Sequence, residues 1–298
     1  IVNLEPNGMG IEDKHYSFPD WAEVPTLPVA ASEGLHEAMK RYEEEQTAAL
    51  KKFAETHRND SEQDYPVMYA GDVTICRSDS NFFSFVRGVN SFTTDAEGYS
   101  YDSRTGEVLT LSQVVKDMSR LQDAVDEVLK ESDESEHAAL AKEALAKDAI
   151  VWALGNEGLE LFIAQSDGNY VDYQRIVISY ERYPELFSEG VKLRPAVYAA
   201  QLMTKAKSYI DGKVVQVKAP ETEGGSFTVM VDDKRFTLEK PEMAGGLISL
   251  LYVKTASGSY LYPEFRGDYS DFSYLIPVNL QSGKAGKLPE DRELSMGF

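Results

Sequence analysis

The clearest pattern along the chain is an apolar stripe with helical spacing between residues 32 and 53. Its positions recur at alternating intervals of four and three residues, which places them on one face of a helix. Ser32 precedes the stripe and is a suitable N-cap. The pattern therefore predicts an amphipathic helix whose buried face consists of Leu35, Met39, Tyr42, Gln46, Ala49 and Phe53.

Residues 65–102 change to a composition that is typical of strands. β-Branched and aromatic residues are enriched there, and glycines at 71, 88 and 98 punctuate them, which favours successive antiparallel strands. The segment from Asp102 to Gly106 has the residues of a tight turn, and Gly106 is available for a positive φ.

Two further helices are predicted after this turn. Ser112 can cap the first, and its buried stripe would consist of Val114, Met118, Leu121, Val125 and Val128. The second is rich in alanine and runs to about residue 148. Its thin apolar face predicts packing at the edge of a domain.

The next segment predicts a hairpin, a strand and a short helical turn. Apolar runs at 150–154 and 159–163 flank a Gly-Asn-Glu-Gly turn, which is the pattern of a hairpin. A strand is expected over 176–180. Residues 183–187 predict a helical turn, because Pro184 stands where a helix start tolerates proline.

Beyond residue 195 the pattern predicts a short linker helix and then only strands. The helix is expected over 196–208. Strands are expected at 214–217, 227–231, 235–238, 247–253, 260–265 and 274–278, with turns at 232–233, 257–258 and 282–283. This region therefore predicts a small, mostly antiparallel β-domain.

Together these elements predict an α+β protein in which helices cover an antiparallel sheet and a small, mostly antiparallel β-domain follows. We expect an extended N-terminal arm over residues 1–31 and an α+β domain over 32–195. The linker helix and the β-domain then occupy residues 196–298.

The charge balance narrows the choice of partners. The chain holds 50 acidic and 30 basic residues, a formal net charge of -20. Such a surface repels nucleic acids and anionic lipids and favours a cationic protein partner, or it serves solubility alone. No apolar run is long enough to span a membrane. Because the chain begins at Ile1, we expect a trimmed or mature form, from which a signal peptide or anchor can have been removed.

Candidate catalytic and metal-binding residues all have a simpler structural interpretation. The four histidines His15, His36, His57 and His137 do not share ligand spacing, so no zinc site is predicted. Asp79 and Asp102 could form a carboxylate pair for acid–base chemistry, or each could cap a turn, with Asp79 alternatively paired to Arg77. The structural interpretation, turn capping or ion pairing, is favoured over acid–base chemistry.

The remaining polar clusters also predict no cofactor. Asp232-Asp233 could bind calcium but suits a hairpin turn better, and the acidic residues at 268 and 271 do not match a calcium loop. The single cysteine, Cys76, lies in an apolar stretch and is expected to act as a small buried hydrophobe.

Aromatic residues supply the only candidate binding surface. Tyrosines are concentrated in the predicted β-domain, and tyrosine is favoured at interfaces because it combines an apolar ring with a polar tip. Ordinary cross-strand packing is the alternative. The candidate ligand-binding residues are Tyr252, Tyr260, Tyr262, Tyr269 and Tyr274.

Three blocks of the chain resemble a bacterial extracytoplasmic domain. The first runs from Arg77 and Asp79 to a Ser-Phe strand at 84–85. The second, at 101–112, contains Asp102 and Gly106 before a leucine pair. The third runs from Trp152 through Gly158 to residue 180. This arrangement is similar to the ectodomain of anti-sigma-V factors that sense lysozyme and to the accessory domain of surface polysaccharide deacetylases.

This resemblance, which covers roughly residues 20–190, implies a secreted or membrane-anchored binding or sensing module. Its partner would be a protein, for example a lysozyme, or a cell-wall glycan, and the module would have no catalytic activity. The chain departs from the family in the loop at 87–94, which lacks the usual histidine, and at 169–173, which lacks a usual glycine. The alternatives are a cell-wall polysaccharide hydrolase or deacetylase and a structural accessory domain of a surface assembly.

Overall fold

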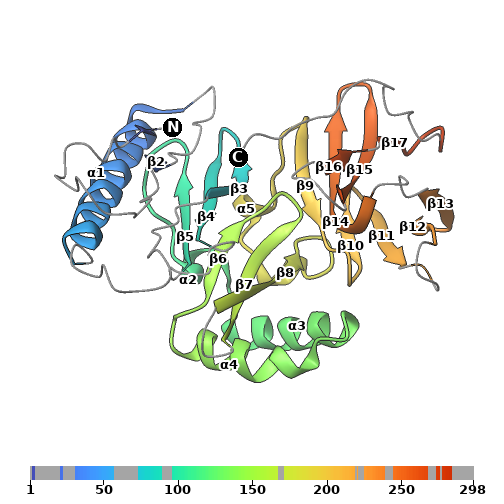
Figure 1. Cartoon of the computed structure of the whole chain (residues 1–298), viewed down its shortest axis with the longest axis horizontal. Coiled ribbons are helices and arrows are strands. Elements are labelled where there is room, and N and C mark those ends of the chain that lie inside the picture. The colour runs from blue at the N-terminus through green and yellow to red at the C-terminus, as the bar shows by residue number, and fades with distance from the viewer. Residues whose placement is uncertain are drawn as a thin grey trace. The chain divides into compact units, whose positions relative to one another are not determined.

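The computed structural model describes residues 2–3, 21–22, 31–56, 73–88, 96–166, 171–218, 220, 225–238, 244–267, 273–275 and 277–283. It contains helices and several small antiparallel sheets (Figure 1), so the α+β class is confirmed at this level. The strands of the predicted helix-covered region form two three-stranded sheets, where the sequence predicted one sheet. None of the described helices is long and apolar enough to cross a membrane.

The chain groups into two compact units built from interleaved segments. The first unit comprises Ile1–Val114, Leu140–Leu154 and Glu160–Arg175, and the second comprises Val115–Ala139, Gly155–Leu159 and Ile176–Phe298. The domain limits expected from the sequence stay a prediction. Within the expected N-terminal arm, the described residues form two short paired strands, β1 (Val2–Asn3) and β2 (Trp21–Ala22).

In the first unit, helix α1 (Glu33–Thr56) covers one face of the sheet β3 (Val73–Ser78), β4 (Phe82–Arg87) and β5 (Glu97–Asp102). Ser32 Oγ accepts a hydrogen bond from the Leu35 amide at 3.1 Å, which confirms the predicted N-cap. The hydrophobic cluster between helix and sheet contains Leu35, Ala38, Met39, Tyr42, Phe83, Phe85 and Tyr101. Ala49, which the stripe placed on the buried face, is exposed, and Phe53 lies outside the residues whose side chains are described.

The opposite face of the same sheet packs against β6 (Val151–Leu154). Strand side chains alternate between faces, so Phe83 and Phe85 point to the helix while Ser84 and Val86 face β6. Ser84 Oγ accepts a hydrogen bond from the Leu154 amide at 2.8 Å, and Val86 packs with Ala153. Strand β4 is therefore buried on both faces.

Strand β6 is also the first strand of the other three-stranded sheet, with β7 (Gly158–Ser166) and β8 (Val171–Ser179). Its three-residue connection to β7 makes the predicted hairpin, closed by a 2.8 Å hydrogen bond from the Gly155 amide to the Gly158 carbonyl. Between β5 and β6 lie the short helix α2 (Leu111–Val114), α3 (Met118–Glu131) and α4 (Ala138–Ala146). Only Ala141 is buried on α4, as its thin stripe predicted.

The prediction of one continuous helix capped by Ser112 is wrong. It is broken into α2 and α3, and Asp117 caps α3 by accepting hydrogen bonds from the amides of Ser119 and Arg120. The chain is extended at the break, where Lys116 donates a backbone hydrogen bond to the Leu186 carbonyl at 2.8 Å. That carbonyl lies in a helical turn at Pro184–Leu186, where the sequence predicted one.

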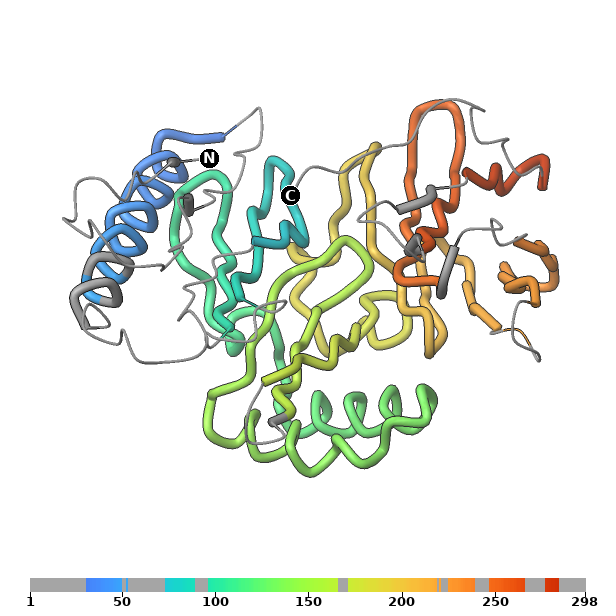
Figure 2. Tube along the Cα trace, viewed as in Figure 1, coloured from blue at the N-terminus to red at the C-terminus, as the bar shows by residue number. Residues whose placement is uncertain are grey.

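The second unit contains two antiparallel sheets after helix α5 (Glu189–Lys192). One has the order β10 (Ser208–Ile210), β11 (Lys213–Lys218), β12 (Phe227–Val231) and β13 (Lys234–Leu238). The five-stranded sheet has the order β16 (Ser273–Leu275), β15 (Gly258–Gly267), β14 (Ala244–Thr255) and β9 (Tyr198–Leu202), and β17 (Val278–Asn279) also pairs with β15. The hairpin of β14 and β15 is the long orange loop in Figure 2.

These two sheets pack face to face, because one hydrophobic cluster draws residues from both. Strands β11 and β12 supply Val215 and Val229, while β14 and β15 supply Leu250 and Leu261. The linker helix predicted at 196–208 is wrong. Tyr198, Ala200 and Leu202 alternate with more exposed neighbours and pair with β14 as the edge strand β9, and this period of two excludes a helix there.

We predict that Gly106→Ala lowers the free energy of unfolding by more than about 2 kcal/mol. Gly106 has a φ of 73°, and a Cβ there would lie 2.0 Å from the Gly34 carbonyl oxygen. Gly190→Ala is the matched control, because nothing lies within 4 Å of its Cβ position, and it should stay within about 1 kcal/mol of the parent. Urea unfolding measures both, and equal stabilities of the two variants would contradict the prediction.

Candidate functional site

The three candidate tyrosines whose side chains are described lie on opposite faces of the five-stranded sheet. Tyr252, on β14, points into the core and is fully buried. Tyr260 and Tyr262, on β15, lie on the outer face and are partly exposed, with ring centroids 6.4 Å apart. Tyr274 belongs to β16, but its side chain lies outside the described set, as does the whole of Tyr269.

Strand register explains this separation. Tyr252 pairs with Leu261, whereas Val253 pairs with Tyr260 and Leu251 pairs with Tyr262; directly opposed residues point to the same face. Strand β9 extends both outer rows across the sheet. We call this surface the tyrosine face, and it consists of Ala199, Gln201, Leu251, Val253, Tyr260 and Tyr262.

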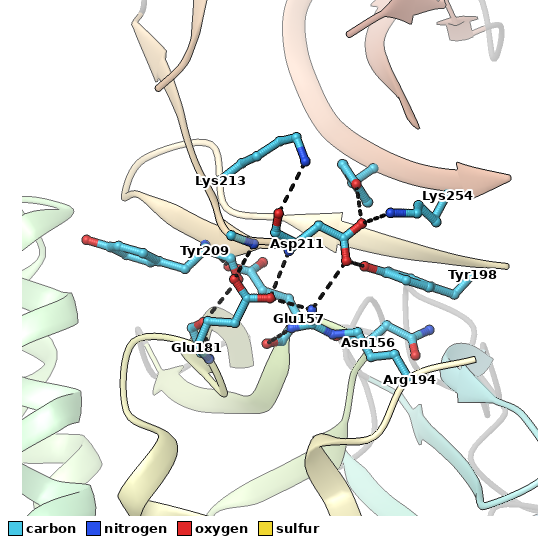
Figure 3. Close-up of polar contacts among 12 residues, drawn as sticks. Asn156, Glu157, Glu181, Arg194, Tyr198, Tyr209, Asp211, Lys213 and Lys254 are labelled. Atoms are coloured by element: carbon cyan, nitrogen blue, oxygen red, sulfur yellow. Dashed lines mark hydrogen bonds and ion pairs between the residues drawn. The ribbon is translucent and has the colours of Figure 1, made fainter. Parts of the chain in front are cut away.

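On the inner side, Tyr252 belongs to a polar cluster centred on the carboxylate of Asp211 (Figure 3). This carboxylate accepts hydrogen bonds from the hydroxyls of Tyr198, at 2.8 Å, and Tyr252, at 2.6 Å, and from Lys254 Nζ at 2.7 Å. Asp211 itself stands in the turn between β10 and β11. Its carboxylate thus joins the four-stranded sheet to β9 and β14 of the five-stranded sheet.

A second carboxylate, that of Glu181, holds the same turn from the other side. It accepts hydrogen bonds from the backbone amides of Asp211 and Gly212, both at 2.8 Å. Arg194 Nη1 pairs with Glu181 at 2.5 Å and lies 3.8 Å from the Asp211 carboxylate. The guanidinium group therefore lies between two carboxylates and offsets their mutual repulsion.

Arg194 extends the cluster to the turn between β6 and β7. Its Nε donates to the Asn156 carbonyl at 2.5 Å, and the Asn156 side chain donates to the Ala199 carbonyl at 2.8 Å. Glu157 Oε1 accepts the Tyr209 amide at 3.0 Å. These contacts fix the loops beside the two sheets, and we call the set of Glu181, Arg194, Tyr198, Asp211, Tyr252 and Lys254 the Asp211 clasp.

The electrostatics of the clasp favour a structural role. Partial burial acts to raise the pKa of Asp211, but hydrogen bonds from Lys254, Tyr252 and Tyr198 outweigh it and lower that pKa to about 2. Burial and the Asp211 carboxylate together raise the pKa of Tyr252. The carboxylate therefore stays ionised and the phenol stays a hydrogen-bond donor at neutral pH, so neither group exchanges protons there.

Asp79 and Arg77 form a buried pair in the turn between β3 and β4. Arg77 Nε contacts Asp79 Oδ2 at 2.6 Å, and the guanidinium lies 4.8 Å from the centroid of the Phe82 ring. The other carboxylate oxygen accepts the amides of Asn81, at 2.7 Å, and Phe82, at 3.0 Å. Asp79 thus combines the two structural roles that the sequence suggested, pairing and turn capping.

Asp102 likewise caps its own turn. Its Oδ1 accepts the amides of Arg104, at 2.8 Å, and Thr105, at 3.3 Å. Arg104 Nη2 contacts Oδ2 at 2.7 Å, and hydrogen bonding from Arg104 lowers the pKa of Asp102. The turn presents Gly106 to the first turn of α1, where the two backbones touch at Gly34.

The other motif residues also mark close backbone approaches. A Cβ at Gly98 would lie 2.1 Å from the carbonyl oxygen of Trp152, where β5 contacts β6. A Cβ at Gly158 would lie 2.2 Å from the carbonyl oxygen of Ile178. The contact at β5 is made by the backbone of Trp152, and its side chain is partly exposed.

Among the described residues, no group of three or more histidine, cysteine, aspartate or glutamate side chains could hold a metal ion. His36 is exposed and His137 lies 3.5 Å from Glu136, while His15, His57, Asp268 and Asp271 lie outside the described residues. Asp232 and Asp233 form the two-residue turn of the β12–β13 hairpin, which was the favoured interpretation.

Cys76 packs beside the buried cluster of Val86, Ala153 and Phe162. Burial, followed by the nearby Glu160 carboxylate, raises the pKa of its thiol. The thiol therefore stays protonated and weakly nucleophilic at neutral pH.

The Asp211 clasp was missed in the sequence, although its centre carries a strong local signal. Asp211 and Gly212 have φ values of 52° and 67° and connect paired strands as a two-residue turn. Asp-Gly between apolar runs is the best short-range predictor of such a hairpin. The partners of Asp211 come from other strands, and no spacing in the sequence indicates them.

No protein-family model matches this chain, and a search of curated proteins finds no match. The resemblance to the anti-sigma-V ectodomain therefore stays a hypothesis that rests on the three sequence blocks.

We predict that Asp211→Asn costs about 1–2 kcal/mol of unfolding free energy, because charge-assisted hydrogen bonds become neutral ones. Asparagine tolerates the positive φ of this turn. The loss of unfolding free energy therefore measures the effect of removing the negative charge. The control is Asp232→Asn, since Asp232 has a φ of 51° and accepts a hydrogen bond from the Val214 amide. Chemical denaturation should show a smaller loss for the control, and the reverse order would contradict the clasp.

The stabilisation by Asp211 should depend on pH in the acid range. Because the folded-state pKa is lowered to about 2 from an ordinary value near ~3.9, the contribution is complete above ~pH 4 and is lost as the pH falls toward ~2. The stability difference between parent and Asp211→Asn should shrink by about 1 kcal/mol over that range, less than the full shift gives, because solvent reaches the carboxylate. Denaturation midpoints across the range measure it, and a pH-independent difference would refute it.

We predict that Asp79→Ala costs about 3 kcal/mol or more, because it leaves a buried guanidinium without its carboxylate. The matched control is Arg104→Ala, which removes an ion pair of similar length whose arginine side chain is 70% exposed, and it should cost less than about 1 kcal/mol. Thermal unfolding compares them. Similar losses in both variants would show that burial of the Arg77 pair does not set its contribution.

Proposed function

We propose that this chain is a non-catalytic binding module that works outside the cytoplasmic membrane and captures a cationic protein. The observation that carries the proposal is the uneven distribution of charge. Residues 1–195 hold 37 acidic and 18 basic side chains, whereas residues 196–298 hold 13 and 12. Nearly all of the net negative charge therefore belongs to the part of the chain with the family resemblance.

Exposed helical positions in that part supply acidic side chains to solvent. On α1 these include Glu37, Glu44 and Glu45. Summed over many such groups, a one-sign surface attracts an oppositely charged protein and speeds its association. A lysozyme is a suitable partner on these grounds, and the resemblance to lysozyme-sensing ectodomains points to the same class.

The proposal of a module without catalysis is supported by the contacts of the suspected acids. The carboxylates of Asp79 and Asp102 both accept backbone amide hydrogen bonds and pair with an arginine. These contacts account for both residues as parts of turns. The extracytoplasmic location is proposed from the resemblance, whose members act on that side of the membrane.

The test is calorimetric titration with lysozyme at 50 and 500 mM NaCl. We expect binding at low salt that weakens at high salt, because screening shortens the reach of surface charges. Replacing Glu37, Glu44 and Glu45 together by glutamine should weaken low-salt binding by about threefold to tenfold. The matched control replaces the same residues by aspartate and keeps the charge.

Salt-insensitive binding, or no binding to lysozyme or to another basic protein such as cytochrome c, would reject the proposed partner class. Equal affinities of the glutamine and aspartate variants would reject the role of these α1 residues.

A further inference from the structure

The tyrosine face differs from the inner face of its own sheet in how its hydroxyl groups are used. The hydroxyls of Tyr198 and Tyr252 both donate hydrogen bonds to the Asp211 carboxylate. Among the described residues, the hydroxyls of Tyr260 and Tyr262 have no hydrogen-bond partner. The outer rings therefore offer both an apolar surface and polar tips to an external ligand.

The two outer rings form a platform on one strand. Their centroids are 6.4 Å apart and their planes are tilted by 47°, and both side chains are partly exposed. Leu251 and Val253 lie opposite them on β14, which extends the apolar surface sideways. The amide of Gln201 ends one row at the edge strand β9.

Charge narrows the kind of occupant. None of the residues that form the tyrosine face is charged. The acid in the next row, Glu264, is engaged by Ser249 Oγ at 2.5 Å. Residues 196–298, which include this sheet, are almost neutral in sum, in contrast to residues 1–195. A charged peptide or headgroup would lose hydration on this face without gaining an opposite charge.

An occupant without polar groups fits poorly as well. It would cover the hydroxyls of Tyr260 and Tyr262 and remove their water without replacing those hydrogen bonds. The ligand that satisfies both conditions is uncharged, has flat apolar patches and carries hydroxyl groups around them. A chain of neutral sugar rings has this chemistry.

We propose that the tyrosine face binds a neutral glycan, with sugar rings stacked on Tyr260 and Tyr262 and hydrogen-bonded by their hydroxyls. This site is chemically distinct from the acidic surface proposed for a cationic protein. Its binding energy comes from ring contact and hydrogen bonds, so it should change little with salt.

The test titrates the full chain with chitohexaose and with cellohexaose, two neutral oligosaccharides, at 50 and 500 mM NaCl. We expect at least one of them to bind, with affinities at the two salt concentrations within about twofold of each other. Replacing Tyr260 and Tyr262 together by alanine should weaken binding about tenfold or more, because both ring contacts are lost. The double phenylalanine variant should keep more affinity than the double alanine variant.

Thr237→Ala is the matched control, since Thr237 is exposed on β13 of the four-stranded sheet, and it should bind as the parent does. Proton spectra of the parent chain should also show the ring signals of Tyr260 and Tyr262 shifting when the sugar is added, a measurement that needs no variant to fold.

Three outcomes would overturn the proposal. These are no binding of either oligosaccharide at millimolar concentration, an alanine variant that binds as the parent does, and alanine substitutions that abolish lysozyme binding or self-association while sugar binding persists. The last result would make the tyrosine face a protein interface. Lysozyme binding that fails while sugar binding holds would reject the proposed function and leave this inference standing.

Discussion

The carboxylate of Asp211 is the interaction on which the second unit depends. It sits in a two-residue turn of one sheet and receives two phenol hydroxyls and an ammonium group from the other. Glu181 and Arg194 hold the same turn through its backbone and its charge. Burying these polar groups is favourable only because each has a partner, and satisfying them fixes how the two sheets lie on each other.

This arrangement also decides what the five-stranded sheet can present to solvent. Tyr252 points inward to the clasp, and its apolar neighbours on the same face point into the core. The side chains at the alternate positions of β14 and β15 therefore form the outer face. Tyr260 and Tyr262 are therefore partly exposed as a consequence of the same register that buries Tyr252. The binding surface proposed here and the stability of the unit share one structural cause.

In the first unit the comparable constraint is the close approach of backbones. Gly34 meets Gly106 between helix α1 and the turn after β5, and Gly98 meets Trp152 between β5 and β6. Glycine is needed because a Cβ at any of these positions would overlap a carbonyl group. The polar motif residue Asp102 caps the turn that places Gly106 against Gly34, and Asp79 caps the turn between β3 and β4.

The sequence by itself determined those features that depend on neighbours along the chain. It located helix α1 and its Ser32 cap, the 102–106 turn and the hairpin turn at Asp232-Asp233, because spacing and turn chemistry are local. Only the tertiary structure decided that residues 198–202 form an edge strand, that the helix after Ser112 breaks, and which tyrosines face outward. Strand pairing and burial are set by partners that are distant in sequence. Residues 198–202 form a strand because they pair with β14. The helix after Ser112 breaks where the Lys116 amide donates a hydrogen bond to the Leu186 carbonyl.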